Sequence, residues 1–328
     1  MAKLQVSMDW LSITFPVAGM DAEHIMHAAC MAVGTRMPML SKREVEEDFG
    51  EWISTTLQAE ELGRGFNGFT DSASLIYFHD DKQIRLGTVA WGGKSQKDRA
   101  YIVLTGIGAQ MLNPLKLESM LDELDGRITR IDTAVDDFQG QFPIEKAVHA
   151  YRKGAFNSGG RPPAAKFIDD LGNKTGKTLY VGKRESGKML RAYQKGLQLN
   201  PGSNDKWIRY EVELHNTDRD IPKDIGAKLV EHFLGAYYYL AMTFSKPLQA
   251  RSEKISCNRI ASKLISLRFW DQFKRQNGRF LNLIYQLNIK PHGFISELTR
   301  VGLPKKLQGR LTPDLIEELK LPFVVLPV

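Results

Sequence analysis

Three short segments carry the residue types that could do chemistry, and each alternates as a β-strand does. Side chains two positions apart lie on the same face of a strand. In residues 130–136 this rule puts Asp132 and Asp136 on one face. The apolar Ile131 and Val135 lie on the other. Because aspartate is disfavoured inside strands, two on one face indicate a role other than packing.

The other two segments add a tyrosine, cations and further carboxylates. The residues that share a face are Arg191, Tyr193 and Lys195 in residues 190–195, and Arg209, Glu211 and Glu213 in residues 207–214. A phenol then lies between two cations. If the three strands are neighbours with their polar faces aligned, four carboxylates, three cations and one tyrosine converge.

Such a cluster could perform phosphodiester transesterification. A tyrosine hydroxyl, with a pKa of about 10, is a poor nucleophile at neutral pH, so Tyr193 needs a metal or cations nearby to lower the cost of ionisation. Carboxylates bind Mg²⁺ or Mn²⁺ through hard oxygen atoms, and the metal would polarise the phosphate. Lys195 or Arg191 would stabilise charge that develops at phosphorus or at the leaving 3′-oxygen.

Each strand face also has an ordinary structural interpretation. A tyrosine in a strand most often packs or presents its hydroxyl to solvent. A face with Arg209, Glu211 and Glu213 is usually a solvated ladder of salt bridges. On the pattern alone both interpretations stay open, whereas Asp132 with Asp136 is less easily explained this way.

The elements that position these segments predict an α+β fold, a mainly antiparallel sheet with helices packed on one face. Alternation and helical spacing assign them as follows: strands within residues 4–15, 74–78, 84–91, 101–104, 130–138, 177–183, 188–195 and 207–214, and helices over 115–124, 144–151 and about 222–242. Beyond residue 248 the pattern becomes that of basic amphipathic helices. The predicted domains are therefore residues 1–248, which carry the polar strands, and a basic helical domain at 249–328.

Charge follows the same division. The chain has 328 residues and a net charge of +7. Residues 251–328 hold 14 of its 45 Lys/Arg and 6 of its 38 Asp/Glu, so the first 250 residues are close to neutral. A basic surface favours an anionic partner such as nucleic acid.

The remaining composition excludes several classes of protein. Cys30 and Cys257 lie far apart, so neither a disulfide framework nor a cysteine zinc site is indicated. The first residues lack the apolar core of a signal peptide, and no apolar run is long enough for a membrane span. We therefore expect a cytoplasmic protein without a membrane partner.

The polar segments also resemble the replication initiation factor family of filamentous phages and rolling-circle plasmids. The matching stretches are residues 8–15, 104–108, 130–137, 178–184, 191–195 and 207–213. Their order and spacing carry the resemblance more than any single motif does.

What this resemblance implies is an origin-specific DNA nickase, built on a fold related to the HUH endonucleases, that starts rolling-circle replication. Carried over by position, Tyr193 becomes joined to the 5′-phosphate of the nick, with Lys195 beside it. Asp132 and Glu211, with Glu213 as a further candidate, would hold Mg²⁺ or Mn²⁺. Asp136 belongs to the same polar face and is a fourth candidate ligand.

The chain departs from the standard HUH pattern in one respect, because it has no His-hydrophobic-His triplet. The nearest approach, residues 24–27, has helical spacing and is typical of an amphipathic surface. In the branch resembled here acidic residues take over metal binding. The ligand set is therefore left open.

Candidate DNA contacts lie outside the polar cluster as well. Residues 182–188 do not match a phosphate-binding loop and are predicted to form a hairpin turn. Its Lys183, Arg184 and Lys188 could touch the DNA backbone, as could Arg209.

Basic and aromatic residues also interleave near the start of the C-terminal segment. The cations there are Arg268, Lys274 and Arg275. This pattern suits duplex DNA or a partner protein, and a helical bundle with a solvated basic face is the alternative.

The resemblance also implies the expected partners and a bacterial host cell. The substrate is origin DNA, single-stranded or in a hairpin at the nick site. A host polymerase would extend the 3′-hydroxyl, and a separate host helicase is needed because the sequence carries no ATP-dependent motor motif. A homodimer is left open. The rival hypotheses are a non-catalytic origin-binding regulator with the same fold and a metal-dependent nuclease that uses water.

Overall fold

A computed structural model of the chain describes residues 4–35, 57–79, 82–96, 98–157, 162–217, 219–255, 275–283 and 286–287. The chain divides into two compact units. The first comprises Met1–Thr217 and Ile221–Ile255, and the second Asp218–Asp220 and Ser256–Val328. In the C-terminal part the structure describes a helix over residues 275–283. Whether 249–328 form a basic helical domain stays a prediction, because most of these residues lie outside the described ones.

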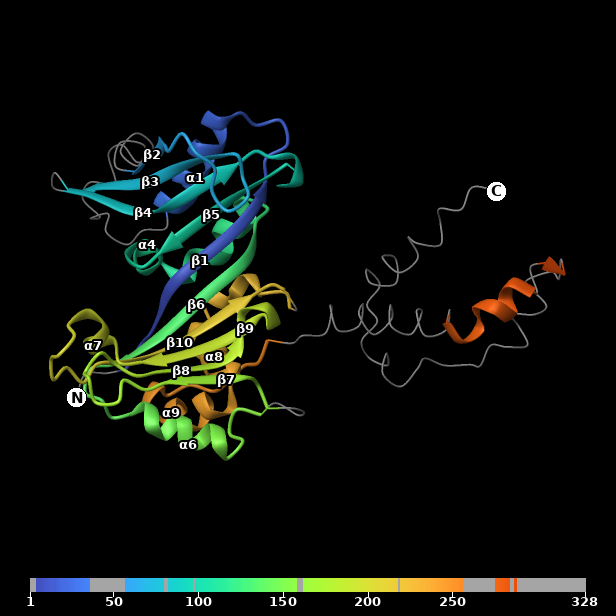
Figure 1. Cartoon of the computed structure of the whole chain (residues 1–328). Helices are drawn as coiled ribbons and strands as arrows, with labels where there is room; N and C mark the ends of the chain where they lie inside the picture. The colour runs from blue at the N-terminus through green and yellow to red at the C-terminus, as the bar shows by residue number, and fades with distance from the viewer. Residues whose placement is uncertain are drawn as a thin grey trace. The chain divides into compact units, whose positions relative to one another are not determined.

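Within the described residues, the first unit is built on one ten-stranded sheet (Figure 1). Its order is β2-β3-β4-β5-β1-β6-β10-β9-β8-β7, and every pairing is antiparallel. The strands are β1 (Val6–Pro16), β2 (Leu57–Glu61), β3 (Asp71–His79), β4 (Lys82–Trp91), β5 (Arg99–Thr105), β6 (Arg127–Asp137), β7 (Ala165–Ile168), β8 (Thr178–Lys183), β9 (Lys188–Tyr193) and β10 (Ile208–His215). The predicted α+β class and mainly antiparallel sheet are confirmed.

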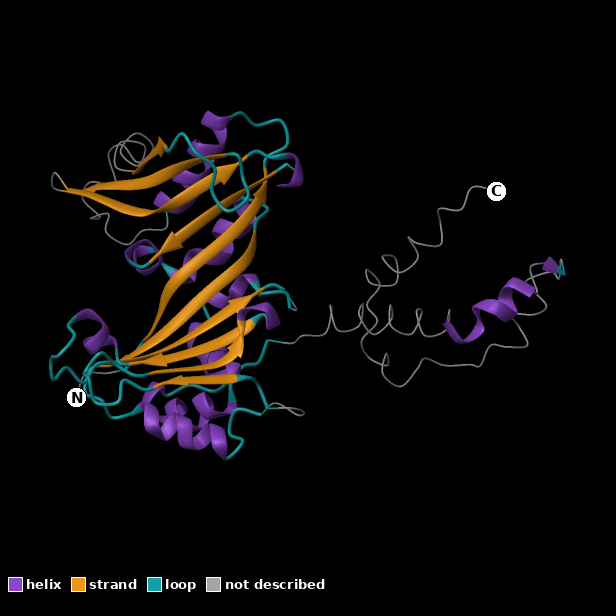
Figure 2. Cartoon of the chain, in the orientation of Figure 1, coloured by secondary structure: helices purple, strands orange, loops and turns teal. Residues whose placement is uncertain are grey.

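The helices are short and connect or cover these strands (Figure 2). They are α1 (Ala22–Gly34), α4 (Ile107–Met111), α5 (Leu117–Glu123), α6 (Ile144–Arg152), α7 (Lys195–Leu199), α8 (Leu229–Ala236) and α9 (Tyr238–Leu248), with 3₁₀ helices η1 (Lys94–Gln96), η2 (Pro114–Lys116), η3 (Arg184–Ser186) and η4 (Lys223–Gly226). No helix among the described residues is both long and apolar enough to cross a membrane.

The core lies against the apolar face of the sheet. In β10 the side chains of Ile208, Tyr210, Val212 and Leu214 are all buried, as their alternation predicts. The Tyr210 ring packs edge-on against Phe244 of α9, with ring centroids 5.1 Å apart. Because this face is covered by helices, the opposite face of β6, β10 and β9 is left for the polar side chains.

Two predicted elements differ from the structure. The helix expected over about 222–242 is broken into η4, α8 and α9, with Tyr237 extended between the last two. The Tyr237 hydroxyl donates a hydrogen bond to the Val181 carbonyl oxygen at 2.9 Å, a tertiary contact that helical spacing cannot reveal. The strand expected over 188–195 ends at Tyr193, and Lys195 begins α7.

Candidate active site

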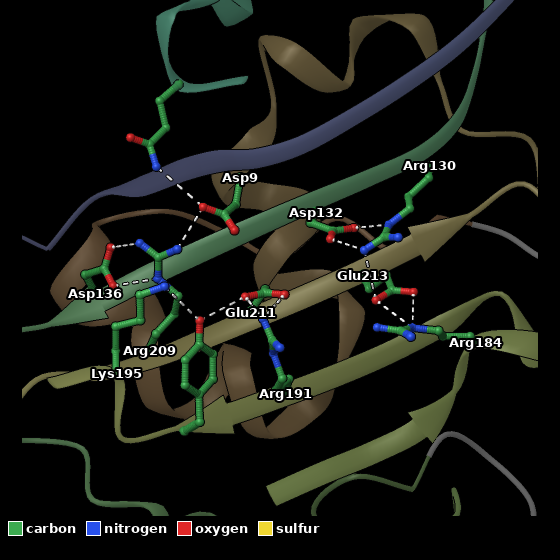
Figure 3. Close-up of polar contacts among 12 residues, drawn as sticks. Asp9, Arg130, Asp132, Asp136, Arg184, Arg191, Lys195, Arg209, Glu211 and Glu213 are labelled. Carbon is green, nitrogen blue, oxygen red and sulfur yellow. Dashed lines mark hydrogen bonds and ion pairs between the residues drawn. The ribbon is translucent and has the colours of Figure 1, made fainter. Parts of the chain in front are cut away.

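The register of β6, β10 and β9 brings the predicted residues onto one face. Glu213 lies opposite Asp132, and Arg209 lies opposite Asp136. On the other side of β10, Arg209 lies opposite Tyr193 and Glu211 opposite Arg191. The three strands are thus neighbours with aligned polar faces, and their side chains form three adjoining groups (Figure 3).

The first group surrounds the hydroxyl of Tyr193. This hydroxyl lies 3.4 Å from Glu211 Oε2 and 3.5 Å from Lys195 Nζ. The side chain is buried, and the Arg191 guanidinium lies over its ring at 4.5 Å. Although Lys195 is on α7 rather than on the strand, its ammonium reaches the position expected for it.

Burial, together with the charge of Glu211, raises the pKa of Tyr193 to about 12. The positive charges of Arg191 and Arg209 oppose this shift without cancelling it. The cations thus act in the expected direction, but burial and Glu211 outweigh them in the pKa of Tyr193. The hydroxyl needs a proton acceptor, and Glu211 is within reach.

Only one guanidinium nitrogen of Arg191 forms hydrogen bonds with Glu211. Its Nη2 donates to both carboxylate oxygens, at 2.9 and 2.8 Å. Its Nε is buried and has no hydrogen-bond partner among the described residues. A donor left without an acceptor in a buried position is costly, so an acceptor at this nitrogen would be stabilising if the side chains around it moved.

The second group joins Asp132 and Glu213 through Arg130. Arg130 Nε and Nη2 donate to the two Asp132 oxygens at 2.9 and 2.6 Å, and Nη2 also reaches Glu213 Oε2 at 3.2 Å. Glu213 further accepts from Arg184 Nε at 2.9 Å and lies 2.5 Å from His215 Nε2.

These two carboxylates have opposite pKa shifts. Burial raises the pKa of Asp132 to about 7, because Arg130 offsets only part of the desolvation. Burial also acts on Glu213, but the hydrogen bond from His215 and the charges of Arg130 and Arg184 outweigh it and hold the pKa of Glu213 below its ordinary value. Asp132 therefore carries a full negative charge only above neutral pH.

The third group holds Arg209 between two aspartates. Its Nε and Nη2 donate to Asp136 at 2.8 and 2.7 Å, and its Nη1 donates to Asp9 at 2.8 Å. Trp207 Nε1 donates to the same Asp136 at 2.6 Å. Arg209 is only 5% exposed, so the structure contradicts its predicted role as a DNA-backbone contact, because its guanidinium is buried in ion pairs.

The predicted metal ligands do not form a metal site as they are arranged here. Among the described residues, no three His, Cys, Asp or Glu side chains come together in a group that could hold an ion. Each predicted ligand instead accepts from an arginine: Asp132 from Arg130, Asp136 from Arg209, Glu211 from Arg191, and Glu213 from Arg130 and Arg184. Their oxygen atoms suit Mg²⁺ or Mn²⁺. Binding would require the arginines to move, so the ligand set stays a prediction.

The predicted DNA contacts of the β8–β9 turn have different surroundings. Lys183 is exposed, and Arg184 pairs with Glu213 while its side chain remains 59% exposed. Lys188 donates to the Ala236 carbonyl oxygen and lies 4.2 Å over the Tyr237 ring. The structure therefore does not present the Lys188 ammonium to DNA, because backbone and aromatic ring already hold it.

The remaining predicted DNA contacts lie in the C-terminal segment. Arg268 and Lys274 are outside the described residues, and Arg275 is exposed on the helix at 275–283. Their roles stay predictions.

Sequence reasoning missed Asp9 and Arg130 as members of the cluster. Arg130 is two positions before Asp132, so alternation alone could have placed it on the polar face. Asp9 is brought in by the pairing of β1 with β6, in which Trp10 lies opposite Asp132. Nothing in the local pattern of β1 indicates this neighbour.

Two comparisons with known proteins found similar chains. A solved structure of a rolling-circle replication initiator protein from Geobacillus stearothermophilus is similar over 77% of this chain and 100% of that one, with a TM-score of 0.50 and 21% sequence identity. This likeness shows a shared fold. No curated protein matches the chain. Residues 126–287, which include all of β6, β9 and β10, match the family described as replication initiation factor.

Proposed function

We propose that the chain is a rolling-circle replication initiator that nicks and rejoins one strand of origin DNA through Tyr193. The observation that carries the proposal is the Tyr193 hydroxyl, which lies between the Glu211 carboxylate and the Lys195 ammonium. The family match over residues 126–287 supports it. A buried phenol between an acid and a base is the arrangement that nucleophilic catalysis requires.

The reaction follows from these contacts. The Tyr193 hydroxyl gives its proton to Glu211, and its oxygen attacks phosphorus. The new bond joins tyrosine to the 5′-phosphate. The bond from phosphorus to the 3′-oxygen breaks, and this oxygen takes up a proton to become a free 3′-hydroxyl. Rejoining is the reverse, in which a 3′-hydroxyl attacks the tyrosyl phosphate.

The cations of the same group would stabilise the phosphate. Lys195 Nζ lies beside the attacking oxygen, and the unpaired Arg191 Nε offers a hydrogen bond to a phosphoryl oxygen. Since the pKa of Tyr193 is about 12, the hydroxyl stays protonated until a substrate and Glu211 act on it together. The proposed reaction depends on Mg²⁺ or Mn²⁺, which would polarise the scissile phosphate.

A covalent-adduct assay tests the proposal. A labelled origin oligonucleotide is incubated with the protein and Mn²⁺ or Mg²⁺, and the products are separated under denaturing conditions. Tyr193→Phe should abolish both cleavage and adduct, because the attacking oxygen is removed. A fully active Tyr193→Phe protein would contradict the assignment.

Tyr180 supplies the matched control. It lies opposite Arg191 on β8, on the same sheet face, and its hydroxyl makes no hydrogen bond among the described residues. Tyr180→Phe should therefore leave the adduct intact. Loss of the adduct in Tyr180→Phe, with its retention in Tyr193→Phe, would identify Tyr180 as the nucleophile instead.

The pairing of all four carboxylates with arginines favours a second candidate, a non-catalytic origin-binding regulator with the same fold. Such a protein would bind origin DNA with strong salt dependence and form no adduct in either metal. A water-using nuclease would cleave without becoming attached. The adduct assay separates all three.

The proposal also defines the partners. The 3′-hydroxyl product would be extended by a host polymerase, and strand separation would need a host helicase. These reactions belong to the cytoplasm of a bacterial host cell. A homodimer is compatible with the chemistry and is not required by it.

A further inference from the structure

A groove of about 690 Å³ opens on the polar side of the sheet, next to the Asp132 group. Four aromatic side chains line it: Trp10 of β1, Tyr101 of β5, and Phe66 and Phe69 from the loop between β2 and β3. Phe66 is 36% exposed, and the other three are partly exposed. Four aromatic rings gathered in one groove form a contiguous apolar surface, which is typical of a binding site.

The rings are held in a defined geometry. Phe66 and Phe69 each stack on Tyr101, with centroids 6.4 and 5.9 Å away and interplanar angles of 25° and 13°. The two phenylalanines flank a tight turn in which Asn67 and Gly68 both have positive φ, the conformation that an Asn-Gly pair favours. The aromatic rim is therefore part of the fold and is not a chance feature of a surface loop.

Cations line the rest of the groove. Arg99, Arg127, Arg130 and His215 all contribute to its walls. No carboxylate lies within ion-pair distance of Arg99 or Arg127 among the described residues. Burial lowers the pKa of Arg99, and the positive charge of Arg127 lowers it further. The charge of Asp125 opposes this shift, but neither arginine forms an ion pair with a carboxylate among the described residues, so both can contact an anion.

We propose that this groove binds single-stranded DNA adjoining the cleavage site, with an unstacked base on the exposed Phe66 ring and phosphates on Arg99 and Arg127. Aromatic platforms combined with a basic channel are the general means of holding single strands, because every base has a π-face. A duplex cannot use the rings, since its bases are stacked on one another. The inference rests on the proposed function and specifies which strand form the site receives.

Arg130 connects the groove with the candidate active site. Its guanidinium lies 4.2 Å over the Trp10 ring and also holds Asp132 and Glu213. A nucleotide that reaches Trp10 therefore contacts Arg130, the arginine that is paired with Asp132 and Glu213. A strand lying in the groove approaches the polar face of β6 and β10 by this route.

Fluorescence anisotropy with the full chain tests the inference. The background is Tyr193→Phe, so that no covalent product contributes to binding. Phe66→Ala should weaken the Kd for a single-stranded oligonucleotide about tenfold, within the range for loss of one base–aromatic stack. Arg127→Gln should weaken Kd and reduce the salt slope by about 0.7, the value for one phosphate contact on a single strand.

Two control variants match these changes in kind. Phe167 is 37% exposed and lies opposite Leu179 on the helix-covered face, so Phe167→Ala should leave Kd unchanged. Arg152 is exposed at the end of α6, and Arg152→Gln should keep the full salt slope. A fluorescent base analogue placed along the oligonucleotide should be quenched by wild-type Phe66 and lose that quenching in Phe66→Ala.

The outcomes are distinguishable from those of the adduct assay. Equal losses for Phe66→Ala and Phe167→Ala would overturn the inference, as would unchanged single-strand binding in Phe66→Ala. An equal loss for a duplex of the same sequence would also overturn it, because the groove would then serve a double helix. If the single strand binds as described but the chain with its native Tyr193 forms no adduct, the binding inference stands and only the proposed nicking function is contradicted.

Discussion

At the scale of single residues, Asp132 and Glu213 show how partners decide the behaviour of a carboxylate. The two lie opposite each other on β6 and β10 and share Arg130. Glu213 has two further partners, Arg184 and His215, whereas Asp132 has none among the described ion pairs. The pKa of Asp132 is consequently raised to about 7, and that of Glu213 is lowered.

This difference predicts that neutralising Asp132 and neutralising Glu213 will change the Tm of the protein in opposite directions. Because the folded-state pKa of Asp132 exceeds the unfolded value of 3.8, the folded state binds more protons and loses stability as pH rises from about 4 to 7. Asp132→Asn should therefore raise Tm at pH 8, by about 2–4 °C for each ~1 kcal/mol recovered, and the gain should vanish near pH 4.

Glu213→Gln is the control of opposite sign. The lowered folded-state pKa of Glu213 contributes stability that is present above 4.5 and lost as pH falls through the folded value. Glu213→Gln should lower Tm at pH 8. Thermal scans of both variants between pH 4 and pH 8 provide the measurement, and a lower Tm for Asp132→Asn at pH 8 would contradict the assigned shift.

At the scale of elements, the β8–β9 hairpin sets the register that places Tyr193 beside Glu211. A slip of one residue would turn Tyr193 to the opposite face. Gly182 near the turn has φ of +91°, and a Cβ there would lie 2.4 Å from the Lys188 carbonyl oxygen and 2.5 Å from the Tyr237 hydroxyl. The hairpin, α8 and α9 thus meet at a position where only glycine fits.

Gly182→Ala should therefore destabilise the protein more than the same replacement at a glycine that also has positive φ but has open space around it. Gly202 has φ of +83° and nothing within 4 Å of its added Cβ, so Gly202→Ala should cost only the backbone term of about 1–2 kcal/mol. Gly182→Ala should add about 1–3 kcal/mol of overpacking. Urea denaturation of both variants measures the difference, and equal midpoints would show that the contacts around Gly182 relax without cost.

At the scale of the whole molecule, the two faces of the sheet have different roles: one packs in the core and the other carries the polar groups. The face of β10 that carries Tyr210 packs on Phe244, while the other face carries the three polar groups and the aromatic groove. The excess positive charge of the chain resides in residues 251–328. We therefore propose that nicking belongs to the polar face of the sheet and general DNA affinity to the basic C-terminal segment.

A combined substitution of Arg268, Lys274 and Arg275 by glutamine tests this division in the full chain. If each cation contacts one phosphate of duplex origin DNA, the salt slope should fall by about 2.7, that is 0.9 per contact. Adduct formation on a single-stranded oligonucleotide should be unchanged, because Tyr193 and its partners are untouched. A loss of the adduct with an unaltered duplex salt slope would argue against the division.

Much of the fold and of the candidate site could be predicted from local pattern. Alternation in residues 130–136 and 207–214 identified the buried and polar faces correctly, because side-chain direction in a strand depends only on the neighbouring residues. The strands over 84–91 and 101–104 were predicted for the same reason. The short edge strands β2 and β7 were not, since β7 has only four residues, all of them exposed, which is too short for alternation to detect.

What the sequence alone determined is which side chains each strand presents; the tertiary structure decided which of them meet. Asp9 reaches Arg209 across 200 positions, and Arg130 reaches Glu213 across 83. The break at Tyr237, the pairing of Asp136, Glu211 and Glu213 with arginines of other strands and the raised pKa of Tyr193 depend on such contacts. The pairing of Asp132 with Arg130 is local, because the two are two positions apart on β6. Burial and charge pairing are properties of the assembled sheet, so no periodicity in the chain could have revealed them.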